Sequence, residues 1–185
     1  MPEVELAKRL KVYGLDPTKV RPVNLDVPAR KELIVRAEDP AYARQFHKLV
    51  PKRIEDVKQW MGVSNKAFKR AVPLMINVPL VISTRTKLTE KNDIVLREIA
   101  RNYVFGHSEA VPKDMVAVLD KWIEYVGGFI GVIIFQDINV AAGATLVYTA
   151  ATPVLFANNI TIGHGGKIVM QATNSKIDCA GITGL

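Results

Sequence analysis

Apolar residues recur at a fixed spacing of 22 positions in the last third of the chain. Residues 137–158 can be aligned with residues 159–180 without a gap. The alignment places similar residues together: Ile138 on Ile160, Val140 on Ile162, Gly143 on Gly165, Leu146 on Ile168 and Leu155 on Ile177. A segment this short cannot bury its own apolar side, but stacking equivalent residues on one another creates a continuous core. The pattern therefore predicts stacked short strands, with the glycines at a turn.

The repeated pattern I-x-V-x-x-G-x-x-L/I-V resembles that of right-handed parallel β-helix proteins. The motif is generic to that architecture, so it points to no particular family and implies no substrate. We expect an α+β fold, with a basic, mainly helical domain over residues 1–126 and a short right-handed parallel β-helix over residues 127–185. An antiparallel β-meander whose hairpins repeat is the alternative.

Helix and strand signals divide the region before the repeats. Helices are predicted at Val4–Leu10, Asp39–Leu49, from Pro51 to about Met61, Ser64–Val72, Ile94–Tyr103 and Lys113–Val126. Strands are predicted at Glu32–Arg36 and Val78–Leu88. The last helix carries Trp122, and we expect it to lie across the first turn of the β-helix as a cap.

The far edge of the stacked strands is predicted to be an assembly site. An open parallel edge has unpaired N–H and C=O groups that can pair with another strand. The residues of this edge are Ile177, Cys179, Ile182 and Thr183. A second copy, a different protein, or a continuation of a longer β-helix would each satisfy it. The favoured function is a non-enzymatic structural or binding protein that uses this edge for self-association or partner docking.

The net charge of +7 is concentrated in residues 1–75, where sixteen Lys and Arg face nine Asp and Glu. The basic residues of two predicted helices form a candidate surface for an anionic partner, either nucleic acid or acidic lipid: Lys48, Lys52, Arg53, Lys58, Lys66, Lys69 and Arg70. Such residues bind phosphates through release of counterions. Solvated helix faces explain the same pattern, and no DNA- or RNA-reading motif accompanies it.

Residue patterns typical of catalysis are missing from the sequence, so we expect no cofactor, no metal site and no catalytic residue. Asp178 with Lys176 or His164 is the best acid–base candidate, but we expect these residues to be solvated outward positions beside the inward Ile177 and Cys179. The remaining histidines, His47 and His107, have no ligand-like spacing. The single cysteine, Cys179, is expected in the core.

A carbohydrate-active or glycan-binding protein is a further alternative, for which only Tyr148 and Phe156 are candidate outward aromatic residues.

The first residues, MPEVELAKRLKVYGLD, are charged and lack the apolar core of a secretory signal. The longest apolar run, Gly127–Phe135, is too short for a membrane span. One cysteine excludes an intramolecular disulfide and slightly favours the cytoplasm.

Overall fold

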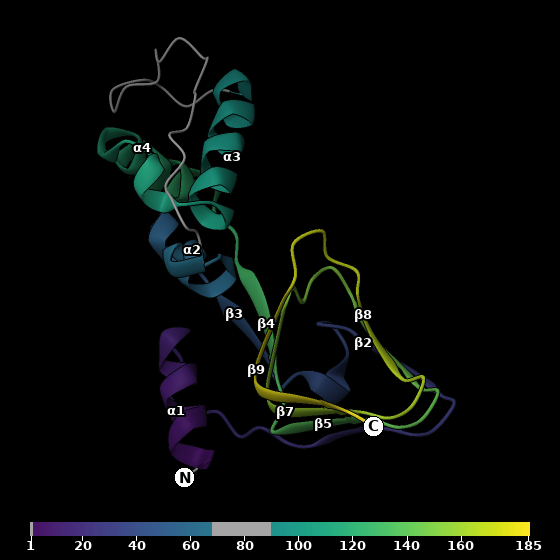
Figure 1. Cartoon of the computed structure of the whole chain (residues 1–185). Coiled ribbons are helices and arrows are strands. Elements are labelled where there is room, and N and C mark those ends of the chain that lie inside the picture. Colours follow the sequence, from purple (N-terminus) through teal and green to yellow (C-terminus); the bar gives the residue numbers. More distant parts are fainter. Residues whose placement is uncertain (1, 68–89) are drawn as a thin grey trace. The chain divides into compact units, whose positions relative to one another are not determined.

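The computed structural model describes residues 2–67 and 90–185 (Figure 1). Contacts divide the chain into two compact units. We call Met1–Leu49 with Phe129–Leu185 the β unit, and Val50–Gly128 the helical unit.

The β unit begins with helix α1 (Pro2–Val12). Its nine strands are β1 (Leu25–Val27), β2 (Glu32–Val35), β3 (Phe46–Leu49), β4 (Ile130–Ile134), β5 (Asp137–Val140), β6 (Thr145–Tyr148), β7 (Val154–Ile162), β8 (Lys167–Met170) and β9 (Lys176–Gly184). One sheet has the order β1-β5-β7-β4-β3, with β9 also paired to β7, and a second has the order β2-β6-β8. The first sheet curls like half of a barrel, and the core lies between it and the second sheet (Figure 1).

Strand neighbours among residues 130–184 are parallel, and their paired residues lie 22 positions apart. Ile138 is the neighbour of Ile160, and Leu146 is the neighbour of Ile168, as the sequence alignment places them. The turns after β5 and β7 contain Gly143 and Gly165, whose φ angles of 65° and 67° favour glycine. These parallel pairs exclude the antiparallel meander.

The predicted α+β class is confirmed, but the predicted right-handed parallel β-helix with an N-terminal helical cap is wrong. The larger sheet is mixed, because β3 runs antiparallel to β4. The structure also does not support a mainly helical domain over residues 1–126, since β1, β2 and β3 belong to the β unit. Only β2 was predicted among these three. Short strands between prolines have too little local pattern to be recognised, and distant partners fix them.

The predicted helix Asp39–Leu49 is also wrong. Asp39 does cap a helical turn, since its Oδ1 accepts a hydrogen bond from the Ala41 amide at 2.9 Å. That turn is the short 3₁₀ helix η1 (Pro40–Tyr42), after which the chain extends into β3. Pairing of β3 with β4, some 84 residues later in sequence, overrides the local helix signal.

The helical unit contains α2 (Ile54–Met61), α3 (Glu90–Phe105) and α4 (Lys113–Val126), with 3₁₀ turns η2 (Asn65–Ala67) and η3 (Ser108–Ala110). Trp122, which we expected to cap the β-strands, is packed into the core of this unit, where its Nε1 donates to Asp93 at 2.8 Å. The predicted helix Ser64–Val72 is described only as far as Ala67, and the predicted strand Val78–Leu88 lies outside the described residues. Within the two described ranges, no helix has the length and apolarity needed to cross a membrane.

Candidate functional site

The two ends of the β unit core differ sharply in exposure. Inward residues stack in columns that run from strand to strand. In one column, Leu25, Ile138 and Ile160 are 7%, 0% and 1% exposed, whereas Ile182 on β9 is 58% exposed. The end at β1 is therefore covered, and the end at β9 is open.

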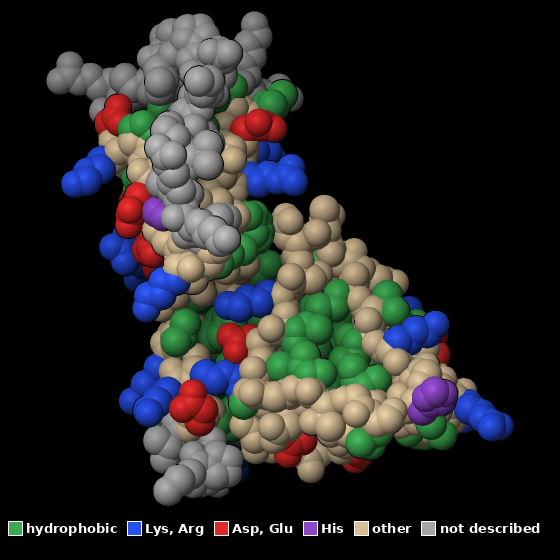
Figure 2. Space-filling model, viewed as in Figure 1, with side chains coloured by type: hydrophobic (Ala, Val, Ile, Leu, Met, Phe, Trp, Pro, Cys, Tyr) green, Lys and Arg blue, Asp and Glu red, His purple; other side chains and the backbone are tan. Residues whose placement is uncertain are grey.

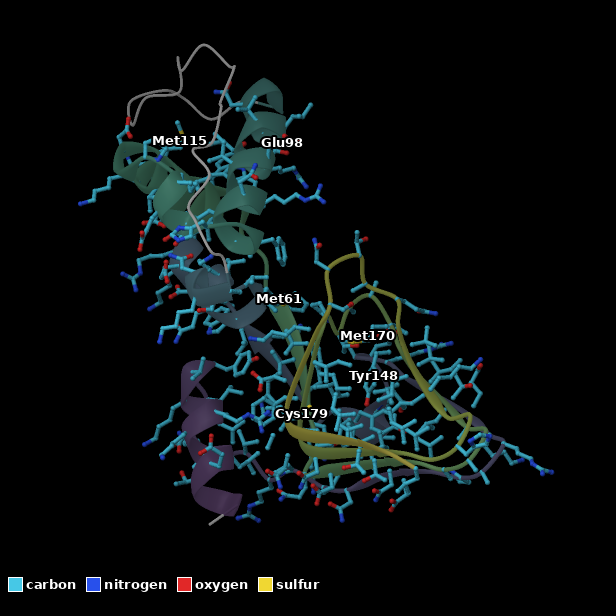
Figure 3. All side chains as sticks on the ribbon, in the orientation of Figure 1. Met61, Glu98, Met115, Tyr148, Met170 and Cys179 are labelled. Atoms are coloured by element: carbon cyan, nitrogen blue, oxygen red, sulfur yellow. The ribbon has the colours of Figure 1, made fainter. Side chains whose placement is uncertain are left out.

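A second column behaves in the same way, because Ile133 and Leu155 are fully buried while Ile177 on β9 is 39% exposed. Figure 2 shows hydrophobic side chains gathered within the outline of the strands on the face that carries β8 and β9. Met170 and Cys179 lie within this outline together with the buried Tyr148 (Figure 3). We call this surface the open end.

The open end also has unpaired backbone. In the part of the chain that the structure describes, β9 pairs only with β7 and β8 pairs only with β6. The other side of an edge strand has N–H and C=O groups without a strand partner. β9 is nine residues long, so its edge is unusually extended for an exposed strand.

The opposite end is covered by the segment between β2 and β3. Tyr42 of η1 packs edge-on against Phe135, with ring centroids 6.1 Å apart. The Gln45 carbonyl accepts the Ile134 amide at 2.9 Å. A hollow of about 520 Å³ remains beside this segment, lined in part by Leu25 and Phe135. We call this surface the covered end; Figure 1 draws its short blue helix within the outline of the strands.

Asp178 on β9 is hydrogen-bonded to Arg9 of α1 and to Tyr13, which follows this helix. We call these three residues the clasp. The Asp178 Oδ1 accepts hydrogen bonds from Arg9 Nε at 3.0 Å and Nη2 at 2.6 Å, and its Oδ2 accepts one from the Tyr13 hydroxyl at 2.6 Å. Arg9 Nη2 also donates to the Ala157 carbonyl at 3.0 Å, and the guanidinium carbon lies 4.4 Å from the centre of the Phe156 ring. Charged partners that are mostly buried make strong, poorly screened hydrogen bonds. The clasp therefore holds β9 in place.

Burial shifts the pKa of groups around the clasp. Desolvation raises the pKa of the Tyr13 phenol, and the hydrogen bond and negative charge of Asp178 raise it further. Desolvation lowers the pKa of Lys176, although Asp178, 3.8 Å away, acts in the opposite direction. Because Asp178 is already engaged by Arg9 and Tyr13, it is not a free acid or base. Lys176 and Asp178, which we expected to be solvated, are only 27% and 21% exposed, and Asp178 pairs with both Lys176 and Arg9.

The four predicted assembly residues, Ile177, Cys179, Ile182 and Thr183, lie together on β9. Cys179 packs against the core, where desolvation raises the pKa of its thiol. A raised thiol pKa disfavours the reactive thiolate. The open edge strand was found from sequence, but the clasp was missed because Arg9 and Asp178 lie 169 positions apart.

The predicted anionic-partner residues are divided between the two units and the residues outside the described ranges. Lys48 belongs to β3 of the β unit, where its Nζ lies 4.7 Å from the centre of the Phe129 ring. Lys52, Arg53 and Lys66 are exposed in the helical unit, and Lys69 and Arg70 lie outside the described residues. Binding of an anionic partner stays a prediction for the exposed members of this set.

Lys58 has a structural role that the sequence pattern did not reveal. The residue is 8% exposed, and its Nζ donates to the carbonyls of Val63 at 2.9 Å, Tyr103 at 3.0 Å and Gly106 at 2.9 Å. It thus satisfies carbonyl groups at the end of α3, which lack partners within the helix. Desolvation lowers the pKa of this amine, opposed by the charge of Glu55.

The remaining candidates do not assemble into a second site. His47 is half-buried in β3, where desolvation lowers its pKa, and His164 lines a hollow of about 550 Å³ with Asn139 and Leu185. Tyr148 and Phe156 are fully buried, so neither is an outward aromatic residue for binding a glycan. Across residues 2–67 and 90–185, no group of three or more His, Cys, Asp and Glu residues is arranged to hold a metal ion.

Comparison with known proteins gives no relative for this chain: no protein-family model, curated protein or solved structure matches it.

Replacing Lys58 with methionine should destabilise the helical unit by about 2–4 kcal/mol, because buried carbonyl groups would lose their donor. Both tryptophans, Trp60 and Trp122, lie in this unit, so urea unfolding followed by tryptophan fluorescence measures the loss. Lys52→Met is the matched control at an exposed position and should change stability by less than about 0.5 kcal/mol. Equal effects of the two substitutions would contradict the role of Lys58.

Stability should fall above about pH 10, the pKa of an unperturbed tyrosine. Desolvation raises the pKa of Tyr13, Tyr103 and Tyr148 in the folded state. The unfolded chain therefore loses these protons at a lower pH than the folded chain, and stability that is present below pH 10 is lost as the pH rises. Each such tyrosine contributes a slope of up to about 1.4 kcal/mol per pH unit. Tyr13→Phe should remove its share of this slope in urea unfolding followed by circular dichroism, whereas Tyr125→Phe, at a residue 70% exposed, should not. An unchanged slope in Tyr13→Phe would contradict the clasp.

Proposed function

We propose that this chain is a non-enzymatic structural protein that assembles with other copies of itself through the open end of its β unit. The observation that carries the proposal is the change along a single column, from fully buried Ile138 to 58% exposed Ile182. An edge strand that is long and apolar is an effective template for pairing with another chain.

The energetics favour strand pairing over side-chain contact alone. Ile177, Ile182, Met170 and Leu185 are each partly exposed, so burying what remains of them contributes about 1 kcal/mol apiece. Association costs at least about 4 kcal/mol in lost translational and rotational freedom. Two copies bury eight such side chains, or about 8 kcal/mol, which lies within the range of about 4–15 kcal/mol that association costs. Backbone hydrogen bonds along β9, at about 0.5–1.5 kcal/mol each, supply the surplus.

The chemistry of the open end supports an assembly role over catalysis. Its carboxylate, Asp178, is occupied by the clasp, and burial raises the pKa of its thiol, Cys179. The clasp instead holds the edge strand in a fixed conformation. Fixing β9 beforehand lowers the conformational entropy that pairing would cost.

Ile182→Lys should weaken self-association at least about tenfold, because a lysine would be placed in the apolar contact. Sedimentation over a series of concentrations measures the change. Val23→Lys is the matched control, since Val23 is 49% exposed but lies before β1, away from the open end. Its association should equal that of the unmodified protein. A protein that stays at 20.5 kDa over the whole concentration range would contradict self-assembly.

A further inference from the structure

We infer that two copies pair open end to open end about a two-fold axis and form a closed dimer. This inference rests on the proposed function and specifies its geometry. The alternative is head-to-tail stacking, in which the open end of one copy meets the covered end of the next and the assembly grows without limit. Three features of the β unit distinguish the two arrangements.

The first feature is that the covered end has little apolar surface left to bury. Its inward residues Leu25, Val27 and Val35 are at most 7% exposed, and Leu33 is partly buried. Tyr42 packs against this core and against Phe135. A second chain arriving here would have to displace η1 before it could contact the core.

The second feature is the length of the edge strands. The edge strands β1, β2 and β3 on the side of the sheets away from β8 and β9 have only three, four and four residues. β1 is followed directly by Pro28, which has no backbone N–H, and Arg30 beyond it has a φ of 57°. Short edges interrupted by proline resist strand addition. The nine-residue β9 would therefore find no matching edge at the covered end.

The third feature is that charge opposes the approach of two identical open ends only weakly, because β8 and β9 hold two lysines against one aspartate. β8 and β9 contain three ionisable side chains besides Cys179, namely Lys167, Lys176 and Asp178. Asp178 forms ion pairs with Arg9 and Lys176, so its charge is compensated within one copy. The exposed inward side chains of β9, Ile177 and Ile182, are apolar, and an apolar patch can pair with a copy of itself.

A mixing experiment separates the two arrangements. Affinity-tagged Ile182→Lys is mixed with untagged, unmodified protein, and the tagged chain is captured. In a two-fold dimer the variant has lost its only interface, so capture of the unmodified chain should fall to background. In a head-to-tail stack the covered end of the variant is intact, so it would still capture the unmodified chain.

Tagged unmodified protein and tagged Val23→Lys are the positive controls, and both should capture the untagged chain at the same level. Circular dichroism checks folding, and Ile177→Lys provides an independent variant at the same end. The unmodified protein should reach a limiting mass of twice 20.5 kDa. If tagged Ile182→Lys captures the unmodified chain but not untagged Ile182→Lys, the two-fold geometry is overturned and assembly through the open end stands. If it captures both equally, the open end is not the interface and both proposals are overturned. A monomer at every concentration would overturn both proposals.

Discussion

The β unit depends on strand β7 and its parallel pairing with three neighbours. Val154 to Phe156 pair with β4, Asn159 to Ile162 pair with β5, and most of the strand pairs with β9. Its inward residues Leu155, Ala157 and Ile160 are at most 1% exposed, and the apolar columns of the larger sheet pass through them. β7 is buried because it has neighbours on both sides. β9 has the same length and a related pattern, but among residues 2–67 and 90–185 it has only one neighbour, which makes it the open edge.

Local patterns in the sequence were sufficient where neighbours in sequence determine the structure. The bounds of α4, Lys113–Val126, were predicted as observed, and the spacing of 22 residues identified the cross-strand neighbours in β5 to β9. Distant pairing decided the rest. Phe46–Leu49 has a good helix start before it, yet it forms a strand against β4. The overall architecture was misjudged for the same reason, because the local pattern of residues 25–49 predicts one strand at Glu32–Arg36 but does not identify its partners among residues 130–184.

Charge was the least reliable guide to the candidate site. Lys58 and Arg9 both contribute to the basic character of the first 75 residues, but both are used within the fold. Lys58 satisfies backbone carbonyls in the helical unit, and Arg9 fastens α1 to Asp178. A count of basic residues cannot separate such internal cations from exposed ones such as Lys52 and Lys66, since the difference lies in tertiary contacts. The periodicity of apolar residues was more informative about the candidate site. Exposing the last residues of an apolar column to water is unfavourable in any tertiary arrangement.

Backbone hydrogen exchange of β9 as a function of protein concentration tests the central claim most directly. If the open end is an interface, the amides of Lys176–Gly184 should exchange slowly in concentrated solution and markedly faster on dilution, while exchange in Leu25–Val27 at the covered end stays constant. Exchange in β9 that is independent of concentration, or a change confined to the covered end, would contradict the assignment of β9 as the assembly edge.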